Sequence, residues 1–247
     1  MTMSAEVSSG SDVIIRMIKV KAAYGAIVVL REIDIELRRG EVLAVLGRNG
    51  VGKTTLVSSL FNLGPQVTGD IYIKGERVTG WPTFKIGRLG MALVPQGRGI
   101  FPNLTVEEAL RMAELRAGRG TRSWTLASIF ESFPRLADRR RSFSGSLSGG
   151  ERQLLAIARG LLTGSDVLLL DEPSEGLAPL AIEEVIVGTV GRLAREGMTM
   201  LLAEQNVAMA LSLATRAVIL AGGRIVFNGN PQELRADREL QREHLGV

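Results

Sequence analysis

The segment VLAVLGRNGVGKTT, residues 42–55, joins an apolar run to a glycine-rich turn and a polar stretch. Residues 42–46 are apolar throughout, which predicts a strand buried on both faces of a sheet. Gly47, Gly50 and Gly52 allow a tight turn with converging N–H groups, and a helix is predicted to follow. The turn and the positive end of that helix together favour an anion, so the segment predicts a phosphate-binding loop.

The loop matches the pattern G-x-x-x-x-G-K-[ST], and its last positions add specific chemistry. Lys53 places a point charge near the β- and γ-phosphates, and Thr54 offers a hydroxyl to Mg²⁺. A glycine-rich turn with an accidental lysine is the alternative, which the position between a strand and a helix disfavours. We predict nucleotide binding by Gly47, Arg48, Asn49, Gly50, Val51, Gly52, Lys53, Thr54 and Thr55.

Two carboxylates follow an apolar run in VLLLDEP, residues 167–173. A buried strand that ends in aspartate places the carboxylate at the carboxyl edge of the sheet, where open α/β sheets bind ligands. We therefore predict that Asp171 holds Mg²⁺ through water, and that Glu172 orients and deprotonates the attacking water. A strand that ends in solvated charges is the alternative, and the phosphate loop makes it less favourable.

The segment LSGGERQ, residues 147–153, opens a strongly apolar predicted helix. Ser148 and Glu151 have the spacing of a capping box. Capping does not explain Gly149 and Gly150 at the first helical positions, where glycine costs stability. An anion that approaches the helix end would explain them. Because the chain already has one phosphate loop, this second anion site suggests two copies that face each other, each closing the other's nucleotide site.

Composition limits the class of protein. The 247 residues are 45% hydrophobic, which indicates a globular chain, and the absence of cysteine excludes disulfides and Cys-based zinc sites. Aromatic residues make up only 4%, which argues against stacking on single-stranded nucleic acid. The net charge of +4 permits an anionic partner without requiring one. No apolar run approaches the roughly 18–20 residues that span a bilayer.

The order of apolar runs predicts a mainly parallel α/β sheet with a helical section inserted between two strands. Gly222 and Gly223 predict a hairpin between the last two strands. The first residues lack the features of a secretory signal, and we expect a disordered tail there. The predicted divisions are the tail at 1–12, one domain over 13–247, its core at 13–96 and 160–232, a helical subdomain at 97–159 and a C-terminal helix at 233–247.

The order of these motifs resembles that of the ATP-binding cassette (ABC) ATPases: phosphate loop, a glutamine after ALVP, LSGGERQ and LLLDEP. The resemblance covers about residues 15–232. It implies an α/β P-loop NTPase (RecA-like) fold with a mixed sheet core, an antiparallel β edge subdomain and an inserted α-helical subdomain. It also implies hydrolysis of ATP with Mg²⁺ as the activity.

The resemblance assigns further site residues. Tyr24, just after a predicted strand at 13–20, corresponds to an aromatic that stacks on adenine, unless it is an exposed edge tyrosine. Gln96 corresponds to a glutamine that touches Mg²⁺ and couples to the transporter, unless it is an ordinary loop amide. The segment SEGLAP, residues 174–179, occupies the place of a loop at the dimer interface but departs from the commoner sequence Ser-Ala-Leu-Asp. The residues implied to contact the nucleotide of the opposite subunit are Ser148, Gly149, Gly150 and Gln153.

The stretch LLAEQNVAMAL, residues 201–211, reads as a buried strand that presents Gln205 to the site. ABC ATPases usually have a histidine there, which contacts the γ-phosphate, but the only histidine of this chain is His244. A neutral amide can donate a hydrogen bond but cannot become a cation near neutral pH. The two hypotheses are weaker hydrolysis, or full activity with Glu172 dominant and Gln205 positioning; we favour the second.

The sequences EQN (204–206) and IFPNLTVEE (100–108) resemble those of the ATPases of branched-chain amino acid importers. The ATPases of urea and amide importers are similar. The resemblance implies a second ATPase subunit as partner, membrane permease subunits, a periplasmic solute-binding protein and a peripheral place on the inner face of the cell membrane. It implies no nucleic acid. A soluble ABC ATPase that acts on nucleic acid or ribosomes is the alternative, but such proteins usually carry two cassettes or long coiled coils. A P-loop kinase leaves LSGGERQ unexplained.

Three apolar residues follow the predicted glutamine loop: Ile100, Phe101 and Leu104. If exposed, they would form an apolar patch on which a membrane subunit could dock. Packing of Phe101 inside the helical subdomain is the alternative.

Overall fold

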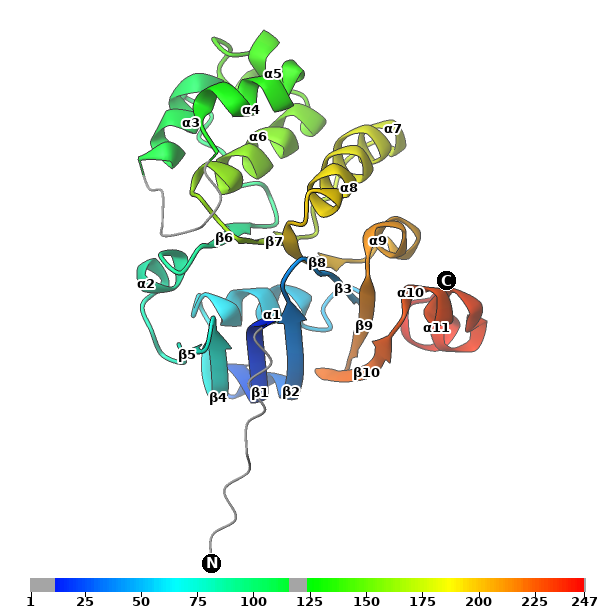
Figure 1. Ribbon diagram of the computed structural model, residues 1–247. Helices are drawn as coiled ribbons and strands as arrows, with labels where there is room; N and C mark the ends of the chain where they lie inside the picture. The colour runs from blue at the N-terminus through cyan, green and yellow to red at the C-terminus, as the bar shows by residue number, and fades with distance from the viewer. Residues whose placement is uncertain (1–11, 116–123, 247) are drawn as a thin grey trace, which may run out of the picture.

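The computed structural model describes residues 12–115 and 124–246 (Figure 1). Of the predicted tail, residues 1–11 lie outside this range. In the described part of the chain, no helix is both long enough and apolar enough to cross a membrane.

The larger sheet has six strands in the order β10-β9-β3-β8-β7-β6. All neighbouring pairs are parallel except β9 with β10. The predicted buried strand at 42–46 is confirmed as β3, which lies between β8 and β9 and is buried at every residue. The strands are β3 (Val42–Leu46), β6 (Met91–Val94), β7 (Val167–Asp171), β8 (Thr199–Glu204), β9 (Arg216–Ala221) and β10 (Arg224–Gly229).

A second, antiparallel sheet has the order β2-β1-β4-β5, and with it the predicted fold class is confirmed. Its strands are β1 (Val13–Tyr24), β2 (Ile27–Arg38), β4 (Gln66–Ile73) and β5 (Glu76–Arg77). The predicted first strand at 13–20 was too short, because β1 keeps its pairing with β2 as far as Tyr24. Tyr24 is therefore the last residue of a strand.

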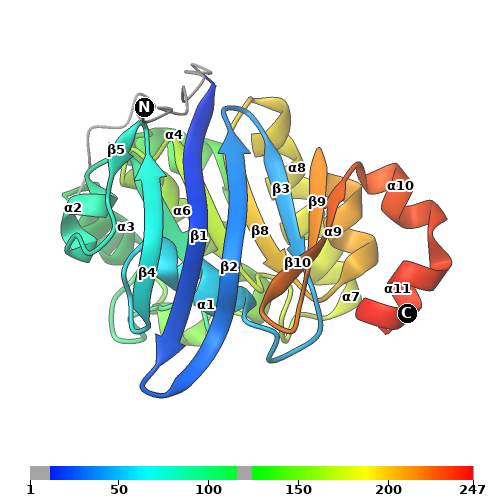
Figure 2. The same ribbon diagram turned by 90° about the horizontal axis from the view of Figure 1, so that it is seen from below.

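The helix after the phosphate loop, α1 (Lys53–Leu60), packs between the two sheets (Figures 1 and 2). Its buried Leu56, Val57 and Leu60 pack in one apolar cluster with side chains of both sheets, such as Ile15 and Val45. An α1 fixed on both sides in this way gives the phosphate loop at its start a rigid support.

The opposite face of the larger sheet is covered by helices from several parts of the chain, including those between β6 and β7 (Figure 1). The remaining helices are α2 (Thr83–Gly87), α3 (Val106–Glu114), α4 (Leu126–Ser132), α5 (Pro134–Asp138), the 3₁₀ turn η1 (Ser144–Ser146), α6 (Gly149–Leu162), α7 (Pro179–Ala181), the π-helix η2 (Ile182–Val187), α8 (Gly188–Arg195), α9 (Val207–Leu213), α10 (Pro231–Ala236) and α11 (Arg238–His244).

The helical stretch 179–195 is one that the sequence analysis does not predict. Its β-branched residues and two glycines are weak helix formers. Val185, Ile186 and Val190 are nevertheless buried in the core on this side of the sheet. Packing therefore decides the conformation of this stretch against its local preference.

The predicted hairpin at Gly222 and Gly223 joins β9 to β10 and also contacts the other sheet. The carbonyl of Gly223 accepts a hydrogen bond from the N–H of Arg31, at 2.7 Å. Gly223 has a φ of 74°, and a Cβ there would lie 2.1 Å from the carbonyl oxygen of Val29. Gly222 has a φ of 55° but open space around it.

Substitutions of Gly222 and Gly223 provide a matched test of the contact between the two sheets. We expect Gly223→Ala to lower the free energy of unfolding by about 2 kcal/mol or more, because the methyl group must displace the backbone of β2. Gly222→Ala should cost only about 1 kcal/mol, the penalty for a positive φ. Urea denaturation measures both, and equal losses would show that the approach to Val29 has no energetic effect.

Candidate functional site

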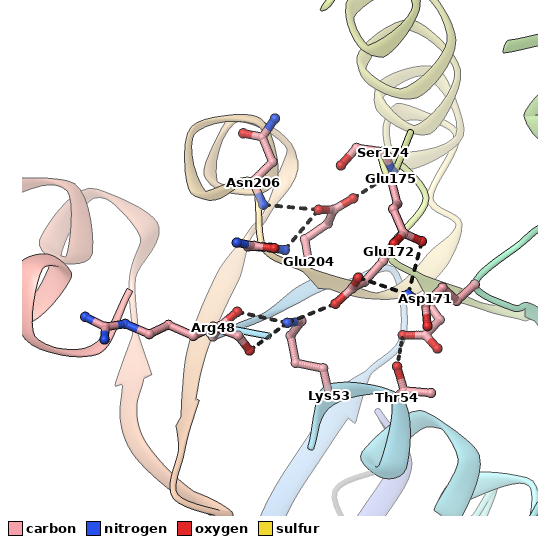
Figure 3. A network of polar contacts seen from close by, with 12 residues as sticks. Arg48, Lys53, Thr54, Asp171, Glu172, Ser174, Glu175, Glu204 and Asn206 are labelled. Carbon is pink, nitrogen blue, oxygen red and sulfur yellow. Dashed lines mark hydrogen bonds and ion pairs between the residues drawn. The ribbon is translucent and has the colours of Figure 1, made fainter. Parts of the chain in front are cut away.

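Three loops at the carboxyl ends of adjacent parallel strands form the candidate site (Figure 3). The phosphate loop follows β3, Glu172 follows β7 and Gln205 follows β8. Because β3, β8 and β7 are neighbours in the sheet, these loops lie together at one edge, where ligands of such sheets bind.

The phosphate loop turns into α1 at Gly52, which has a φ of 110° and lies at the N-cap of the helix. Such a backbone suits glycine and no residue with a Cβ. Of the predicted nucleotide-binding residues, Gly47, Gly52, Lys53 and Thr55 are buried, Val51 is partly buried, and Arg48, Asn49, Gly50 and Thr54 are exposed.

The ammonium group of Lys53 lies at the centre of the site, and the residue is only 3% exposed. It donates to the carbonyl oxygens of Gly47 at 2.9 Å and Arg48 at 3.1 Å. It also forms an ion pair with Glu172, with 2.9 Å between Nζ and Oε1. These acceptors compensate the burial of the charge, and all come from the site itself.

Thr54 and Asp171 lie opposite each other, and the hydroxyl of Thr54 donates to Oδ1 of Asp171 at 3.2 Å. Burial raises the pKa of Asp171 to about 6, and the carboxylates of Glu172 and Glu175 act in the same direction. The hydrogen bond from Thr54 and the charge of Lys53 oppose this rise. A cation beside Asp171 would favour its ionised form.

A magnesium ion fits these donors, although the protein alone would not enclose it. The hydroxyl of Thr54 and the carboxylate of Asp171 are the hard oxygen ligands that Mg²⁺ prefers. In residues 12–115 and 124–246 no group of three acidic, histidine or cysteine side chains could hold a metal. The site therefore suits an ion that takes its remaining ligands from water and from nucleotide phosphates.

Glu172 follows β7 with a φ of 47°, an uncommon conformation for a residue with a side chain. Its backbone N–H donates to the carbonyl of Ala203 in β8, at 2.8 Å. The amide of Gln96 lies 3.5 Å from Oε2 of Glu172 and donates to Glu175 at 3.0 Å. The structure thus brings Gln96 to the predicted water-activating carboxylate.

Glu204 is a site residue that the sequence analysis missed. It is the last residue of β8 and is only 1% exposed. Its carboxylate accepts hydrogen bonds from the N–H groups of Ser174 at 2.9 Å, Gln205 at 3.0 Å and Asn206 at 3.2 Å (Figure 3). Burial raises the pKa of Glu204, and these bonds favour its charged form. The carboxylate therefore joins the loop after Glu172 to the loop of Gln205.

The position of Glu204 adds to the interpretation of the stretch 201–211. Strand β8 ends there as predicted and buries the side chain of Glu204, whereas Gln205, the residue predicted to be presented to the site, is exposed. Asn206 caps α9, since its side chain accepts from the N–H of Met209. The available signal was a carboxylate at the last position of an apolar strand, the same signal that marked Asp171.

The predicted capping box at the start of α6 is confirmed. Ser148 accepts from the N–H of Glu151, whose carboxylate accepts from the N–H of Ser148 at 2.7 Å. The structure adds a second reason for the two glycines. A Cβ on Gly149 would lie 3.3 Å from Leu177, and one on Gly150 would lie 3.2 Å from Val185. Close packing inside the chain therefore also favours glycine at these positions.

The buried position of Gln153 contradicts its predicted role. It was predicted to contact the nucleotide of an opposite subunit with Ser148, Gly149 and Gly150, but it is 2% exposed. Three residues beyond Gly150 its side chain lies on the inner face of α6, where its Oε1 accepts from Arg98 Nε at 3.2 Å. Arg98 also donates to the carbonyl of Glu175, at 2.8 Å. Gln153 thus acts inside the subunit and connects α6 to the loop 174–179.

Two predicted nucleotide-binding residues lie at the margin of the site. Tyr24 is 45% exposed and lies against the loop after α1, since a Cβ on Gly64 would be 3.5 Å from its ring. The side chain of Arg48 extends away from Lys53, toward α11 (Figure 3). Its backbone carbonyl, however, contributes to the site by accepting from Lys53.

The apolar residues after Gln96 divide into two groups. Ile100 and Leu104 pack against the buried core, whereas Phe101 is 44% exposed. The guanidinium of Arg159 lies 4.9 Å from the centre of the Phe101 ring. Of the two alternatives for Phe101, the structure favours the exposed one.

Comparison with known proteins finds similarity to ATP-binding proteins of ABC transporters. A family model described as "ABC transporter" matches residues 30–175. The chain is 40% identical to the high-affinity branched-chain amino acid transport ATP-binding protein BraG of Pseudomonas aeruginosa, covering 92% of this chain and 97% of the relative. It is 35% identical to the probable branched-chain amino acid transport ATP-binding protein LivF of Archaeoglobus fulgidus, over 94% and 99%.

Similarity extends to proteins of other named functions and to solved structures. The chain is 31% identical to the lipopolysaccharide export system ATP-binding protein LptB of Haemophilus influenzae, over 91% of this chain and 93% of that one. The structure of an ATP-binding subunit of an ABC transporter, 28% identical, superposes with a TM-score of 0.76 over 94% of this chain and 96% of that one. A nucleotide-free ATP-binding cassette, 23% identical, gives 0.80 over 92% and 96% and shows the fold alone.

Glu204 can be tested separately from the charged groups around Lys53. We expect Glu204→Gln to lower the free energy of unfolding by about 1–3 kcal/mol, because an amide N–H₂ then faces a buried backbone N–H. ATP hydrolysis should also fall, since the loops of Glu172 and Gln205 lose their common acceptor. Thermal unfolding and steady-state ATP hydrolysis measure the two effects.

The matched control is Glu183→Gln, the same change at an exposed position. It should alter stability by less than about 0.5 kcal/mol. A Glu204→Gln protein as stable and active as this control would mean that the buried carboxylate does not organise the loops.

Proposed function

Because the chain belongs to the ABC transporter family, as an ATP-binding ATPase, we propose that it drives an importer of branched-chain amino acids. The observation that carries the proposal is the meeting of Lys53, Thr54, Asp171 and Glu172 at one edge of the sheet. An ATPase subunit does not itself touch the solute, so the site gives no information about the solute. The proposed class of solute therefore rests on the similarity to BraG and LivF.

In this proposal each side chain has a defined task in ATP hydrolysis. Lys53 and the N–H groups of the loop bind the phosphates, and Thr54 and Asp171 hold Mg²⁺, with Gln96 nearby. Mg²⁺, when bound, neutralises charge on the β- and γ-phosphates. Glu172 orients a water molecule toward the γ-phosphorus and accepts its proton as the bond from the β–γ bridging oxygen to the γ-phosphorus breaks.

The ion pair between Lys53 and Glu172 suggests how binding prepares the site. Each is the counter-ion of the other at 2.9 Å, so the carboxylate lies where Lys53 would meet a phosphate. A phosphate that replaces this carboxylate satisfies Lys53 and releases Glu172 toward the water. Gln205, on the neighbouring loop, would position the γ-phosphate without supplying charge, as the second hypothesis holds.

A second cassette subunit would complete the site, as the sequence motifs suggest. Ser148 is exposed, and Gly149 and Gly150 are partly exposed. The N–H groups of Gly149 and Gly150 have no partner within α6, since the first turn of a helix lacks acceptors. We assign them to the nucleotide of the facing subunit, and Gln153 to the support behind them.

Membrane permease subunits are the further partners in this proposal, with a periplasmic solute-binding protein that delivers the solute. The exposed Phe101, which follows Gln96 closely in the sequence, supports a docking surface for a permease segment. This contact would place the protein on the inner face of the cell membrane.

Tyr24 would stack on adenine, for which its exposed ring leaves room.

Two variants test the catalytic assignment. Lys53→Ala should weaken nucleotide binding about tenfold or more, because charge-assisted hydrogen bonds to phosphate are lost. Glu172→Gln should lose at least about 100-fold in hydrolysis but still bind ATP, since only the general base and the counter-ion of Lys53 are removed. Phosphate release and equilibrium binding measure the two effects.

With ATP, Glu172→Gln should also accumulate a closed dimer, visible by size-exclusion chromatography with light scattering. A non-identical second cassette is then tried as the partner if this chain stays monomeric. Unchanged hydrolysis in Glu172→Gln would remove this carboxylate from the reaction.

The importer itself requires a test in membranes. The protein should co-purify with polytopic membrane subunits from detergent-solubilised membranes, and uptake of labelled leucine should depend on Lys53. Co-purification with ribosomes or DNA would instead support a soluble ABC ATPase, and phosphorylation of an added acceptor would support a kinase. Uptake of urea or an amide in place of leucine would change the solute and keep the motor assignment.

A further inference from the structure

We infer that α11 is part of the nucleotide site, because it positions the phosphate loop through the side chain of Arg48. This inference rests on the assignment of residues 47–55 as the loop that binds nucleotide. Arg48 is then a positioning residue, which acts on the nucleotide through the backbone of the loop.

The guanidinium of Arg48 contacts the last turn of α11. It lies 3.2 Å from the carbonyl oxygen of Arg242 and 3.3 Å from that of Glu243, and donates to both. Helix carbonyls at this end have no N–H partner within the helix, so a guanidinium is a suitable donor for them. The contact joins residues 194 and 195 positions apart in the chain.

The backbone just after α11 is shaped around this guanidinium. Gly246 has a φ of 79°, and a Cβ there would lie 3.3 Å from two nitrogens of Arg48. The N–H groups of Leu245 and Gly246 both donate to the carbonyl of Gln241, at 2.8 and 2.9 Å, which ends the helix. Arg48 therefore fits against a formed helix end and not against a loose segment.

A side chain of α11 fixes the helix in turn. Nε2 of Gln241 donates to the carbonyl oxygens of Leu234 at 2.7 Å and Arg235 at 3.1 Å, at the end of α10. Leu234 is fully buried in the core, so α10 is a firm support. The connection thus runs from the core through α10 and Gln241 to α11, and from there to Arg48.

The connection ends at the atoms that hold Lys53. The carbonyls of Gly47 and Arg48 both accept from its ammonium, so the backbone at Arg48 determines where that charge lies. Residues 48–50 are exposed and have little packing of their own. An anchored Arg48 side chain reduces the freedom of this part of the loop before a phosphate arrives, and preorganisation of that kind favours binding.

The consequence is a specific kinetic pattern. Loss of the anchor should weaken ADP and ATP binding and raise KM, whereas kcat should stay nearly constant because Glu172 and Asp171 are untouched. The effect should be about two- to fivefold, since Arg48 is exposed and exposed charged contacts are weak.

A double-mutant cycle in the full chain tests the inference. ADP binding is measured by isothermal titration calorimetry for Arg48→Ala, for Gln241→Ala and for the pair, and ATP hydrolysis gives KM and kcat. Both single changes should weaken binding, and the pair should be no weaker than Arg48→Ala alone, because both remove the same connection. Arg48→Lys should restore binding only in part, since one ammonium cannot match the fork of a guanidinium.

Matched controls separate this effect from general damage. Arg238→Ala removes an exposed arginine from the other end of α11, and Gln232→Ala makes the glutamine change on α10 at an exposed position. Both should leave the Kd for ADP unchanged. Equal melting temperatures without ligand would show that all the variants fold alike.

Other outcomes overturn the inference in distinguishable ways. If Arg48→Ala weakens binding but Gln241→Ala does not, Arg48 touches the nucleotide directly and α11 has no part. If neither change alters the Kd while Lys53→Ala does, the contact with α11 is structural only. If Lys53→Ala also leaves the Kd unchanged, the assignment of the phosphate loop fails first.

Discussion

The structure depends on one buried positive charge, the ammonium of Lys53. A charge that is 3% exposed is stable only where acceptors surround it, and here they are two loop carbonyls and the carboxylate of Glu172. This requirement explains why the loop must turn so tightly that its carbonyls face inward. It also explains why the strand end that carries Glu172 must lie close by. The same arrangement makes the site ready for phosphate, because an anion can replace the one flexible acceptor and leave the two backbone acceptors in place.

The order of strands in the larger sheet meets this requirement. Strand β8 separates β3 from β7, so the loop after β8 lies between the phosphate loop and the two carboxylates. Glu204 uses that central position. With one carboxylate it satisfies N–H groups from its own loop and from the loop after β7. On the side of α6, Arg98 makes a comparable connection between Gln153 and the loop 174–179. Loops that are distant in sequence are therefore held together by a few buried or partly buried polar side chains.

Sequence patterns predict the parts of this molecule whose chemistry is local. The apolar run of β3, the glycines of the loop, the paired carboxylates at the end of β7 and the capping box of α6 each need only neighbours in the chain. The unpredicted features depend on distant contacts. The helix at 179–195 forms because Val185 and Val190 are buried, against a local preference for other structure. The inward side chains of Gln153 and Glu204 depend on Arg98 and Ser174, and Arg48 depends on a helix almost two hundred residues later.

The glycines that open α6 show how one residue type can satisfy two constraints. Leu177 and Val185 approach them from within the chain, so a side chain at either position would press against these neighbours. The capping box meanwhile satisfies the N–H of Glu151 and the N–H of Ser148, and leaves those of Gly149 and Gly150. The close packing on one side positions the helix end, and the missing side chains expose its free N–H groups on the other. Internal packing and an approaching anion are therefore compatible explanations, because the segment 177–185, whose close packing favours glycine here, also positions the helix end.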